Sequence, residues 1–226
     1  MSASRSKLNT HSEEVRNAKV VPLRHIRGVY AITPEMHNDA ALTILVEQAL
    51  AGGVRILQYR HKNLSPTQVM RQALACQELC KKANALFVVN DSASFAAQIG
   101  AVACHLGRDD GTVAAARAAL THGIIGVSCY NDLARAHQLA LEGADYLAFG
   151  AAFKSTVKPN APHADLSVFK AARVAFKLPI VAIGGITLTN APTLIDAGVD
   201  AIAVISDLFS APDVEARARA FSGLFK

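Results

Sequence analysis

Side chains able to bind an anion stand close together at Gln58, Arg60 and Lys62. In an extended strand every second side chain points to the same side, so all three would face one way. Two cations beside an amide suit a phosphorylated anion, because a guanidinium can bind two oxygens at once. An isolated pair of cations is more often part of a solvated loop. Whether these residues bind an anion or form a solvated loop therefore depends on the secondary-structure element that contains them.

Carboxylates follow two apolar runs further along the chain. Asp91 ends the run at 86–91, and Asp109 and Asp110 follow the run at 102–107. Asp91 with one of the other two could hold a Mg²⁺ ion, which prefers one or two carboxylates together with water and substrate phosphates. Each carboxylate could instead begin a helix or form a turn.

Eight apolar runs of strand length recur along the chain, and several of these side chains stand at their ends. The runs cover residues 28–33, 54–60, 86–91, 102–107, 124–129, 146–151, 179–185 and 201–206. Helical spacing marks the segments between them, and Ser65-Pro66 is typical of a helix start. Strands that alternate with helices pair in parallel, and eight such units predict a single (β/α)₈ barrel, an α/β fold, over residues 28–226. An open doubly wound sheet usually has fewer strands.

The carboxyl ends of the strands are where the active sites of such barrels lie. At these ends the sequence has Ser128 in the fifth run, Gly185 in the seventh and Ile205-Ser206 in the eighth. Backbone N–H groups after strands 7 and 8 often bind phosphate. A polar segment at 154–159 has the length and the residue types of a lid over an anion. The strand ends predict a diphosphate and metal set on strands 2 to 5 and a second phosphate site on strands 7 and 8.

Residues that could do other chemistry have simpler roles. Cys76 and Cys80 lie one helical turn apart and are expected in a helix core rather than at a metal or in a disulfide. His105 and His61 are expected to be structural, and neither a Ser-His-Asp nor a Cys-His set is apparent. Glycines that follow helical segments are expected as left-handed caps; they are Gly52, Gly100, Gly143 and Gly198.

The net charge of +5 is unevenly distributed. Residues 1–27 hold six of the 23 basic and two of the 18 acidic residues, so the rest of the chain, with 17 and 16, is nearly neutral. This gives no reason to expect a nucleic-acid partner. No apolar stretch reaches the roughly 18 residues of a membrane span, so we expect a soluble, cytoplasmic protein. The first 27 residues are expected to form an arm, since they lack the apolar core of a secretion signal and contain Glu13 and Glu14, which a transit peptide would avoid.

The ordered set of strand-end motifs resembles the thiamine-phosphate synthase family. The similar segments are "YAIT" (30–33), "QYRHK" (58–62), "ND" (90–91), "HLG" with a following Asp (105–110), "GVS" (126–128), "GADY" (143–146), "STVK" (155–158), "AIGGI" (182–186) and "VIS" (204–206). The set covers most of the chain, and its order makes it specific. Val157 stands where the family often has a second Thr.

The resemblance implies an enzyme that joins a hydroxymethylpyrimidine diphosphate to a thiazole phosphate and releases pyrophosphate. It implies that the pyrimidine diphosphate is held by Gln58, Arg60, Lys62, Asn90, Ser128 and Lys158, of which Arg60, Lys62, Ser128 and Lys158 are catalytic. It implies Mg²⁺ on Asp91 and Asp110, the latter chosen over Asp109 by spacing. The thiazole phosphate would be held by Ser155, Gly185, Ile205 and Ser206, to which the chemistry of the loop adds Thr156.

Three alternatives remain beside this hypothesis. A thiazole tautomerase-like relative would share the barrel without the diphosphate residues, and the set of Arg60, Lys62, Asp91 and Asp110 disfavours it. The same complete set also disfavours a non-catalytic barrel that binds thiamine precursors. Another phosphate-handling barrel would need a general acid and base. The oligomeric state does not follow from the sequence.

Overall fold

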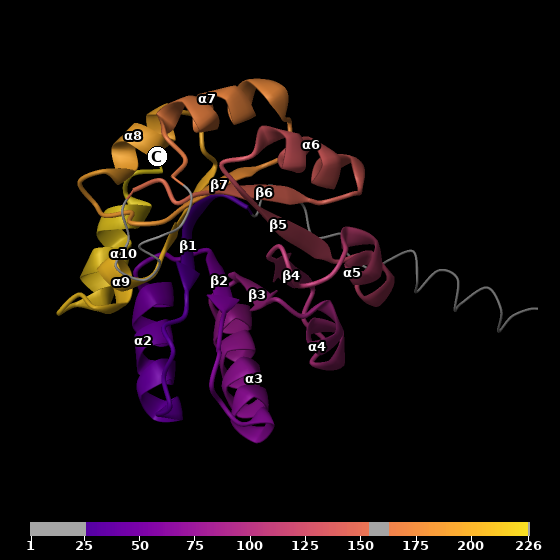
Figure 1. The fold of residues 1–226 in the computed structure, drawn as a ribbon. Helices are drawn as coiled ribbons and strands as arrows, with labels where there is room; N and C mark the ends of the chain where they lie inside the picture. The colour runs from indigo at the N-terminus through magenta and orange to yellow at the C-terminus, as the bar shows by residue number, and fades with distance from the viewer. Residues whose placement is uncertain (1–25, 154–162, 226) are drawn as a thin grey trace, which may run out of the picture.

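Eight parallel strands close into a barrel in the order of the sequence. A computed structural model describes residues 26–153 and 163–225 (Figure 1). Each strand pairs with its neighbours in the chain, and β8 pairs with β1. The strands are β1 (Gly28–Ile32), β2 (Ile56–Tyr59), β3 (Leu86–Asn90), β4 (Ala103–Leu106), β5 (Ile124–Tyr130), β6 (Tyr146–Phe149), β7 (Ile180–Ile183) and β8 (Ala201–Val204). The predicted (β/α)₈ barrel is confirmed.

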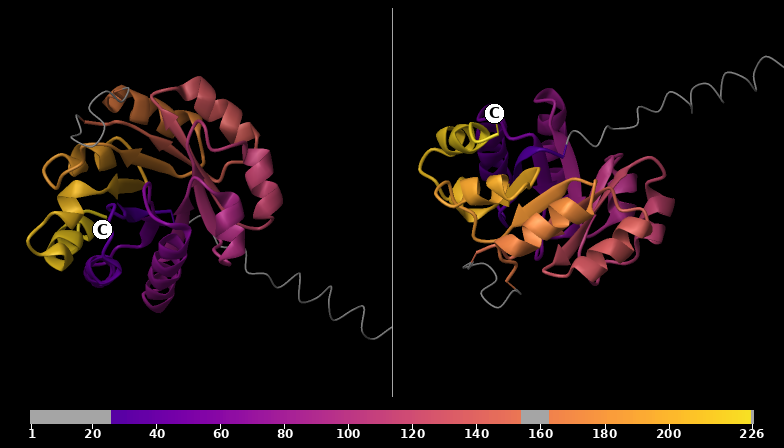
Figure 2. Two further views of the ribbon diagram at one scale, coloured as in Figure 1. Left: turned by 60° about the horizontal axis from the view of Figure 1, so that its bottom comes forward. Right: turned by 90° about the horizontal axis from the view of Figure 1, so that it is seen from above.

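Helices surround the barrel on its outside (Figure 2). They are α2 (Asp39–Ala51), α3 (Pro66–Lys82), α4 (Ala93–Gln98), α5 (Val113–Ala119), α6 (Leu133–Leu141), α7 (Leu166–Ala175), α8 (Ala191–Asp196), α9 (Ser206–Phe209) and α10 (Val214–Ser222). Most begin at a side chain that accepts a backbone hydrogen bond. Ser65 caps α3 by accepting from the Gln68 N–H, and Pro66 takes the first helical position, as predicted.

The core has two parts, separated by the wall of the barrel. Between the strands and the helices lies the larger one, which includes Val46, Cys76 and Cys80. All four cysteines are buried thiols, and the predicted core role of Cys76 and Cys80 is confirmed. The smaller part fills the inside of the barrel with side chains such as Ile56 and Val88. Such a filled interior leaves room for ligands only at the barrel ends.

The glycine after α2 has a different role from the one predicted. Gly52 has φ −76°, so it is not a left-handed cap. A Cβ on Gly52 would lie 2.4 Å from the Ala218 Cβ, so the absence of a side chain lets α10 pack against α2. Gly53, with φ +98°, makes the left-handed turn instead. The other three predicted caps, Gly100, Gly143 and Gly198, do have positive φ.

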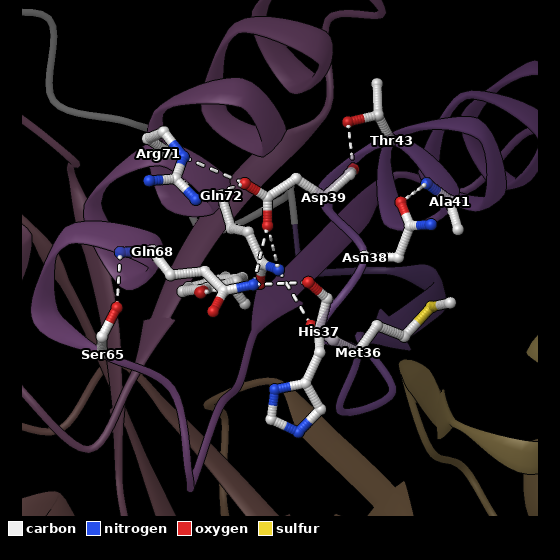
Figure 3. Close-up of polar contacts among 11 residues, drawn as sticks. Met36, His37, Asn38, Asp39, Ala41, Thr43, Ser65, Gln68, Arg71 and Gln72 are labelled. Atoms are coloured by element: carbon white, nitrogen blue, oxygen red, sulfur yellow. Dashed lines mark hydrogen bonds and ion pairs between the residues drawn. The ribbon is translucent and has the colours of Figure 1, made fainter.

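One carboxylate joins the first two helices of the barrel. Asp39, in the first turn of α2, accepts hydrogen bonds from Gln68, Arg71 and Gln72 of α3 (Figure 3). These bonds lower the pKa of Asp39, with that from Gln68 as the largest cause. Gln72 in turn accepts from the Tyr59 hydroxyl at 3.1 Å, so the cluster reaches the outward face of β2. In the described part of the chain, no helix is long and apolar enough to cross a membrane.

Candidate active site

A cavity of about 750 Å³ lies at the carboxyl ends of the strands. The predicted site residues that line it are Gln58, Arg60, Lys62, Asn90, Asp91, Asp110, Ser128, Gly185, Ile205 and Ser206. The structure thus brings together the two residue sets that the sequence placed on strands 2 to 5 and on strands 7 and 8. Ser155, Thr156 and Lys158 lie outside the described residues, as does Val157.

The two cations follow directly from the end of β2. Gln58 is buried in the barrel, whereas Arg60 is half-buried and Lys62 exposed. Thr33, after β1, fixes this end of the strand: its hydroxyl donates to the Arg60 carbonyl at 3.2 Å and accepts from the Arg60 N–H at 2.9 Å. The Thr of the "YAIT" segment therefore sets the direction in which Arg60 leaves the sheet.

Asp91 and Asp110 meet at the ends of β3 and β4. Asp91 has φ +65°, a left-handed conformation that is rare outside glycine, asparagine and aspartate. Its carboxyl group contacts that of Asp110, and burial, together with this contact, raises the pKa of Asp91 to about 6. Asp110 accepts from the Gly107 N–H at 2.7 Å. A Cβ on Gly107 would lie 2.6 Å from the Asp110 carboxylate, so this glycine permits the approach.

Neighbouring residues, rather than these carboxylates, begin the helices. Ser92 caps α4 by accepting from the Phe95 N–H, and Thr112 caps α5 by accepting from the Ala115 N–H. The helix-start interpretation therefore applies to Ser92 and not to Asp91. Two carboxylates held together in one cavity are a donor set that fits a hard divalent cation, since each relieves its repulsion by binding the ion. Within the described ranges no group of three or more His, Cys, Asp or Glu residues gathers, and a Mg²⁺ ion on one or two carboxylates usually completes its coordination with water and substrate phosphate.

Ser128 lies where β5 departs from regular pairing. The register between β5 and β6 shifts between Ser128 and Tyr130, which turns the strand end at this point. Arg135, on α6, donates to the Ser128 carbonyl at 3.0 Å and holds the backbone there. The Ser128 hydroxyl lies 2.9 Å from His105 Nε2. Burial lowers the pKa of His105 to about 4, so this ring is neutral at pH 7.

Three aromatic side chains were not assigned to the site from the sequence. Tyr30 and His105 line the cavity, and Tyr146 lies behind them. The segments "YAIT", "HLG" and "GADY" contain all three, but an apolar strand is a common place for a tyrosine that only fills the core. Only their contacts across the barrel distinguish them from core residues.

The loops after β7 and β8 form the opposite wall of the cavity. Gly184 and Gly185 both have positive φ, at 104° and 62°. A Cβ on Gly184 would lie 2.6 Å from the Ala151 Cα, so a side chain there would push apart two loops of the site. Asn190 donates to the Gly185 carbonyl at 3.0 Å and fixes the turn. Ser206 begins the short helix α9 beside it.

Comparisons with known proteins agree with this arrangement. The sequence matches the thiamine monophosphate synthase family over residues 29–208. It is 53% identical over 201 residues to a thiamine-phosphate synthase of Methylobacillus flagellatus, covering 88% of this chain and 96% of the relative. A thiamine-phosphate synthase of an Azoarcus species is 47% identical, with coverage of 88% and 98%. The solved thiamine phosphate pyrophosphorylase of Pyrococcus furiosus superposes with a TM-score of 0.82 at 30% identity, covering 90% and 98%. The chain belongs to the thiamine monophosphate synthase family, whose members are transferases of thiamine biosynthesis.

Proposed function

We propose that this chain joins 4-amino-2-methyl-5-(diphosphooxymethyl)pyrimidine to a thiazole phosphate, giving thiamine monophosphate and pyrophosphate. The observation that carries the proposal is the composition of one cavity. Two cations, Arg60 and Lys62, and the carboxylate pair Asp91–Asp110 face it from one side, and the loops after β7 and β8 from the other. One side suits a diphosphate with a metal ion, and the other suits a phosphate bound by backbone N–H groups.

Charge balance supports the assignment of the diphosphate to the first side. A bound diphosphate carries about −3, and Arg60, Lys62 and Lys158 with Mg²⁺, less the two aspartates, supply about +3. Asp91 and Asp110 would hold the Mg²⁺, which when bound would neutralise the leaving diphosphate. Asn90 and Gln58 would orient the pyrimidine, and Ser128 would bind it from β5. Gly185, Ile205 and Ser206, with Ser155 and Thr156, would hold the thiazole phosphate.

The reaction itself needs little proton transfer. The bond between the pyrimidine methylene carbon and the diphosphate oxygen breaks, both electrons leave with pyrophosphate, and the aminopyrimidine stabilises the methylene cation. The thiazole nitrogen then attacks this carbon and becomes the ring cation of the product. That nitrogen has no proton to lose, so the chain needs no general base. A site whose one buried histidine is neutral and hydrogen-bonded on both ring nitrogens suits this chemistry.

Pyrophosphate release tests the proposal directly. We expect release when both substrates are present with Mg²⁺, and loss of release when a chelator removes the ion or when either substrate is omitted. Arg60→Ala should lower kcat/KM by at least about 100-fold, since a charge-assisted contact to the leaving group is lost. Arg55→Ala, a cation at the opposite end of the same strand, should stay within about twofold of the wild type. Tight binding of one substrate without any pyrophosphate would instead favour a precursor-binding barrel.

The choice of Asp110 over Asp109 as metal-binding residue needs its own comparison. Both line the cavity, but Asp110 is the one in contact with Asp91. We expect Asp110→Asn to raise the Mg²⁺ concentration for half-maximal activity about tenfold or more. Asp109→Asn should change it by less than about threefold, and the reverse order would contradict the assignment. We also propose that the enzyme works in the cytoplasm, where its four buried thiols stay reduced.

A further inference from the structure

A continuous chain of hydrogen bonds crosses the inside of the barrel. The Gln58 amide nitrogen lies 2.8 Å from the Tyr30 hydroxyl, which lies 2.8 Å from the Tyr146 hydroxyl. The Tyr146 hydroxyl lies 3.0 Å from His105 Nδ1, and His105 Nε2 lies 2.9 Å from the Ser128 hydroxyl. The five residues come from β2, β1, β6, β4 and β5, so the hydrogen bonds link the end of β2 to the end of β5 through the barrel interior. Its two ends are residues assigned above to the pyrimidine substrate.

Tyr146 occupies the middle of this chain without reaching the cavity. Its side chain is fully buried, and it is absent from the cavity lining to which the other four residues belong. The ring stacks on His105 at 5.6 Å between centroids and meets Tyr30 edge-on at 6.1 Å. Gly126 provides the space, because a Cβ there would lie 1.9 Å from the ring carbon that carries the Tyr146 hydroxyl. The glycine of the "GVS" segment therefore accommodates a residue 20 positions away.

The donor and acceptor groups of these five residues indicate which atom donates in each hydrogen bond. The Gln58 amide nitrogen can only donate, so the Tyr30 oxygen accepts there; Tyr146 is then the remaining side-chain partner of the Tyr30 hydroxyl within the described residues, and the Tyr30 proton is assigned to that bond. The Tyr146 proton then goes to His105 Nδ1. A neutral imidazole that accepts at Nδ1 has its proton on Nε2 and donates it to Ser128. The Ser128 oxygen is then an acceptor within the chain, and its own proton is free to point into the cavity.

We propose that Tyr146 is a positioning residue that fixes Ser128 as a hydrogen-bond donor toward the pyrimidine substrate. The proposal rests on the function proposed above, because an aminopyrimidine offers ring nitrogens that accept and an amino group that donates. Through the same chain the Gln58 amide is held with its nitrogen toward Tyr30. Gln58 and Ser128, at the two ends of this series of hydrogen bonds, therefore each keep the same donor or acceptor atom toward a pyrimidine ring bound between them. Without the middle hydroxyl, both His105 and Ser128 could adopt the opposite polarity.

Tyr146→Phe removes the middle hydroxyl and keeps the ring. We expect kcat/KM for the pyrimidine diphosphate to fall about tenfold, the size of one lost hydrogen bond, while KM for the thiazole phosphate stays within about twofold. Tyr59→Phe is the matched control, since Tyr59 is equally buried and its hydroxyl bonds Gln72 on the outside of the barrel. Tyr59→Phe should leave kcat/KM for the pyrimidine diphosphate and KM for the thiazole phosphate within about twofold of the wild-type values. Equal losses in the two variants would mean a purely structural role and would overturn the proposal.

Coupling to Ser128 provides a second test. If Tyr146 acts through Ser128, adding Tyr146→Phe to Ser128→Ala should cause no further loss beyond about twofold. Losses that multiply would show that the two residues act independently and would overturn the proposal.

A spectroscopic readout keeps the inference separate from the proposed activity. Nitrogen-15 NMR of the histidine rings, with His105 identified by its absence in His105→Gln, should show a proton on Nε2 in the wild type. In Tyr146→Phe we expect a mixture of the two tautomers, and Tyr59→Phe should match the wild type. A wild-type proton on Nδ1 would overturn the proposed direction even in an active enzyme. An inactive protein with the proton on Nε2 would instead place the failure in the proposed function.

Discussion

Asp91 combines two features that destabilise the folded chain. Its backbone is in the left-handed region, and its carboxyl group is held against that of Asp110. Such strain and like-charge contact are found at binding sites, where a ligand relieves them. The neighbouring Ser92 has an ordinary extended backbone and caps α4. Of these two adjacent residues, Asp91 therefore lines the cavity, whereas Ser92 begins the helix.

Replacing Asp91 by asparagine should therefore stabilise the metal-free protein. Asparagine tolerates the left-handed conformation and removes the repulsion with Asp110. In a chelator at pH 7 we expect the Tm of Asp91→Asn to exceed that of the wild type by roughly 2–4 °C, a gain of about 1 kcal/mol. Added Mg²⁺ should raise the Tm of the wild type and not that of the variant. An Asp91→Asn protein that Mg²⁺ stabilises as strongly as the wild type would contradict the metal site.

Residue types at strand ends could be assigned from the sequence, and residue partners could not. Strand alternation and the position after a buried run were enough to bring Gln58, Asp91 and Ser128 to one cavity. The role of Tyr146 could not be predicted from the sequence, because its hydrogen-bond partner Tyr30 lies 116 positions earlier in the chain. A buried tyrosine whose hydroxyl is bonded looks in the sequence like one that only fills the core.

At the scale of elements, the first two helices depend on a single ionised carboxylate. Asp39 accepts from three side chains of α3, and its pKa is lowered (Figure 3). A folded-state pKa below the unfolded value stabilises the fold at pH values above the unfolded value, which is 3.8. The stabilisation is then lost as the pH falls through the lower folded-state value. The link between α2 and α3 should weaken in acid for this reason.

The variant Asp39→Asn measures this link. We expect its Tm to lie below that of the wild type at pH 7, because an amide cannot accept from all three donors as a carboxylate does. The difference should shrink as the pH falls below the unfolded pKa of 3.8 and through the lower folded-state pKa, because the wild-type carboxylate then becomes protonated. Asp196→Asn, an exposed carboxylate at the end of α8, serves as the control and should show no such trend. A Tm difference that is constant between pH 7 and pH 3 would rule out the ionised carboxylate as its cause.

The elements were predictable to the extent that periodicity defines them. All eight strands lie where the apolar runs predict them, with ends that differ by at most two residues. Gly52 was assigned wrongly because its small size serves the approach of Ala218 on α10, a contact between distant segments. The short helix α9 was not predicted, because four residues carry no helical period.

For the whole molecule, the barrel is closed at one end by packing and open at the other to ligands. Ile26 is buried, with a relative exposure of 1%, and belongs to the cluster that fills the barrel interior. It precedes β1 and so lies at the amino-terminal end of the strands, opposite the cavity. Residues that stabilise the barrel and residues that line the candidate active site therefore lie at opposite ends, as is usual in barrels of this kind. The family match begins shortly afterwards, at residue 29.

This separation predicts opposite effects for two changes near the amino terminus. The arm was predicted over residues 1–27, but Ile26 packs in the barrel interior, so the deletion to test is that of residues 1–25. It should leave the Tm within about 2 °C and kcat within about twofold. Ile26→Ala in the full chain should lower the free energy of unfolding by about 2–4 kcal/mol, because it leaves a cavity in the barrel interior. Urea unfolding and pyrophosphate release measure the two quantities on the same samples. Because the candidate active site lies at the other end, kcat of Ile26→Ala should stay near the wild-type value below its unfolding temperature. A truncated chain as unstable as Ile26→Ala would show that the first 25 residues belong to the folded unit.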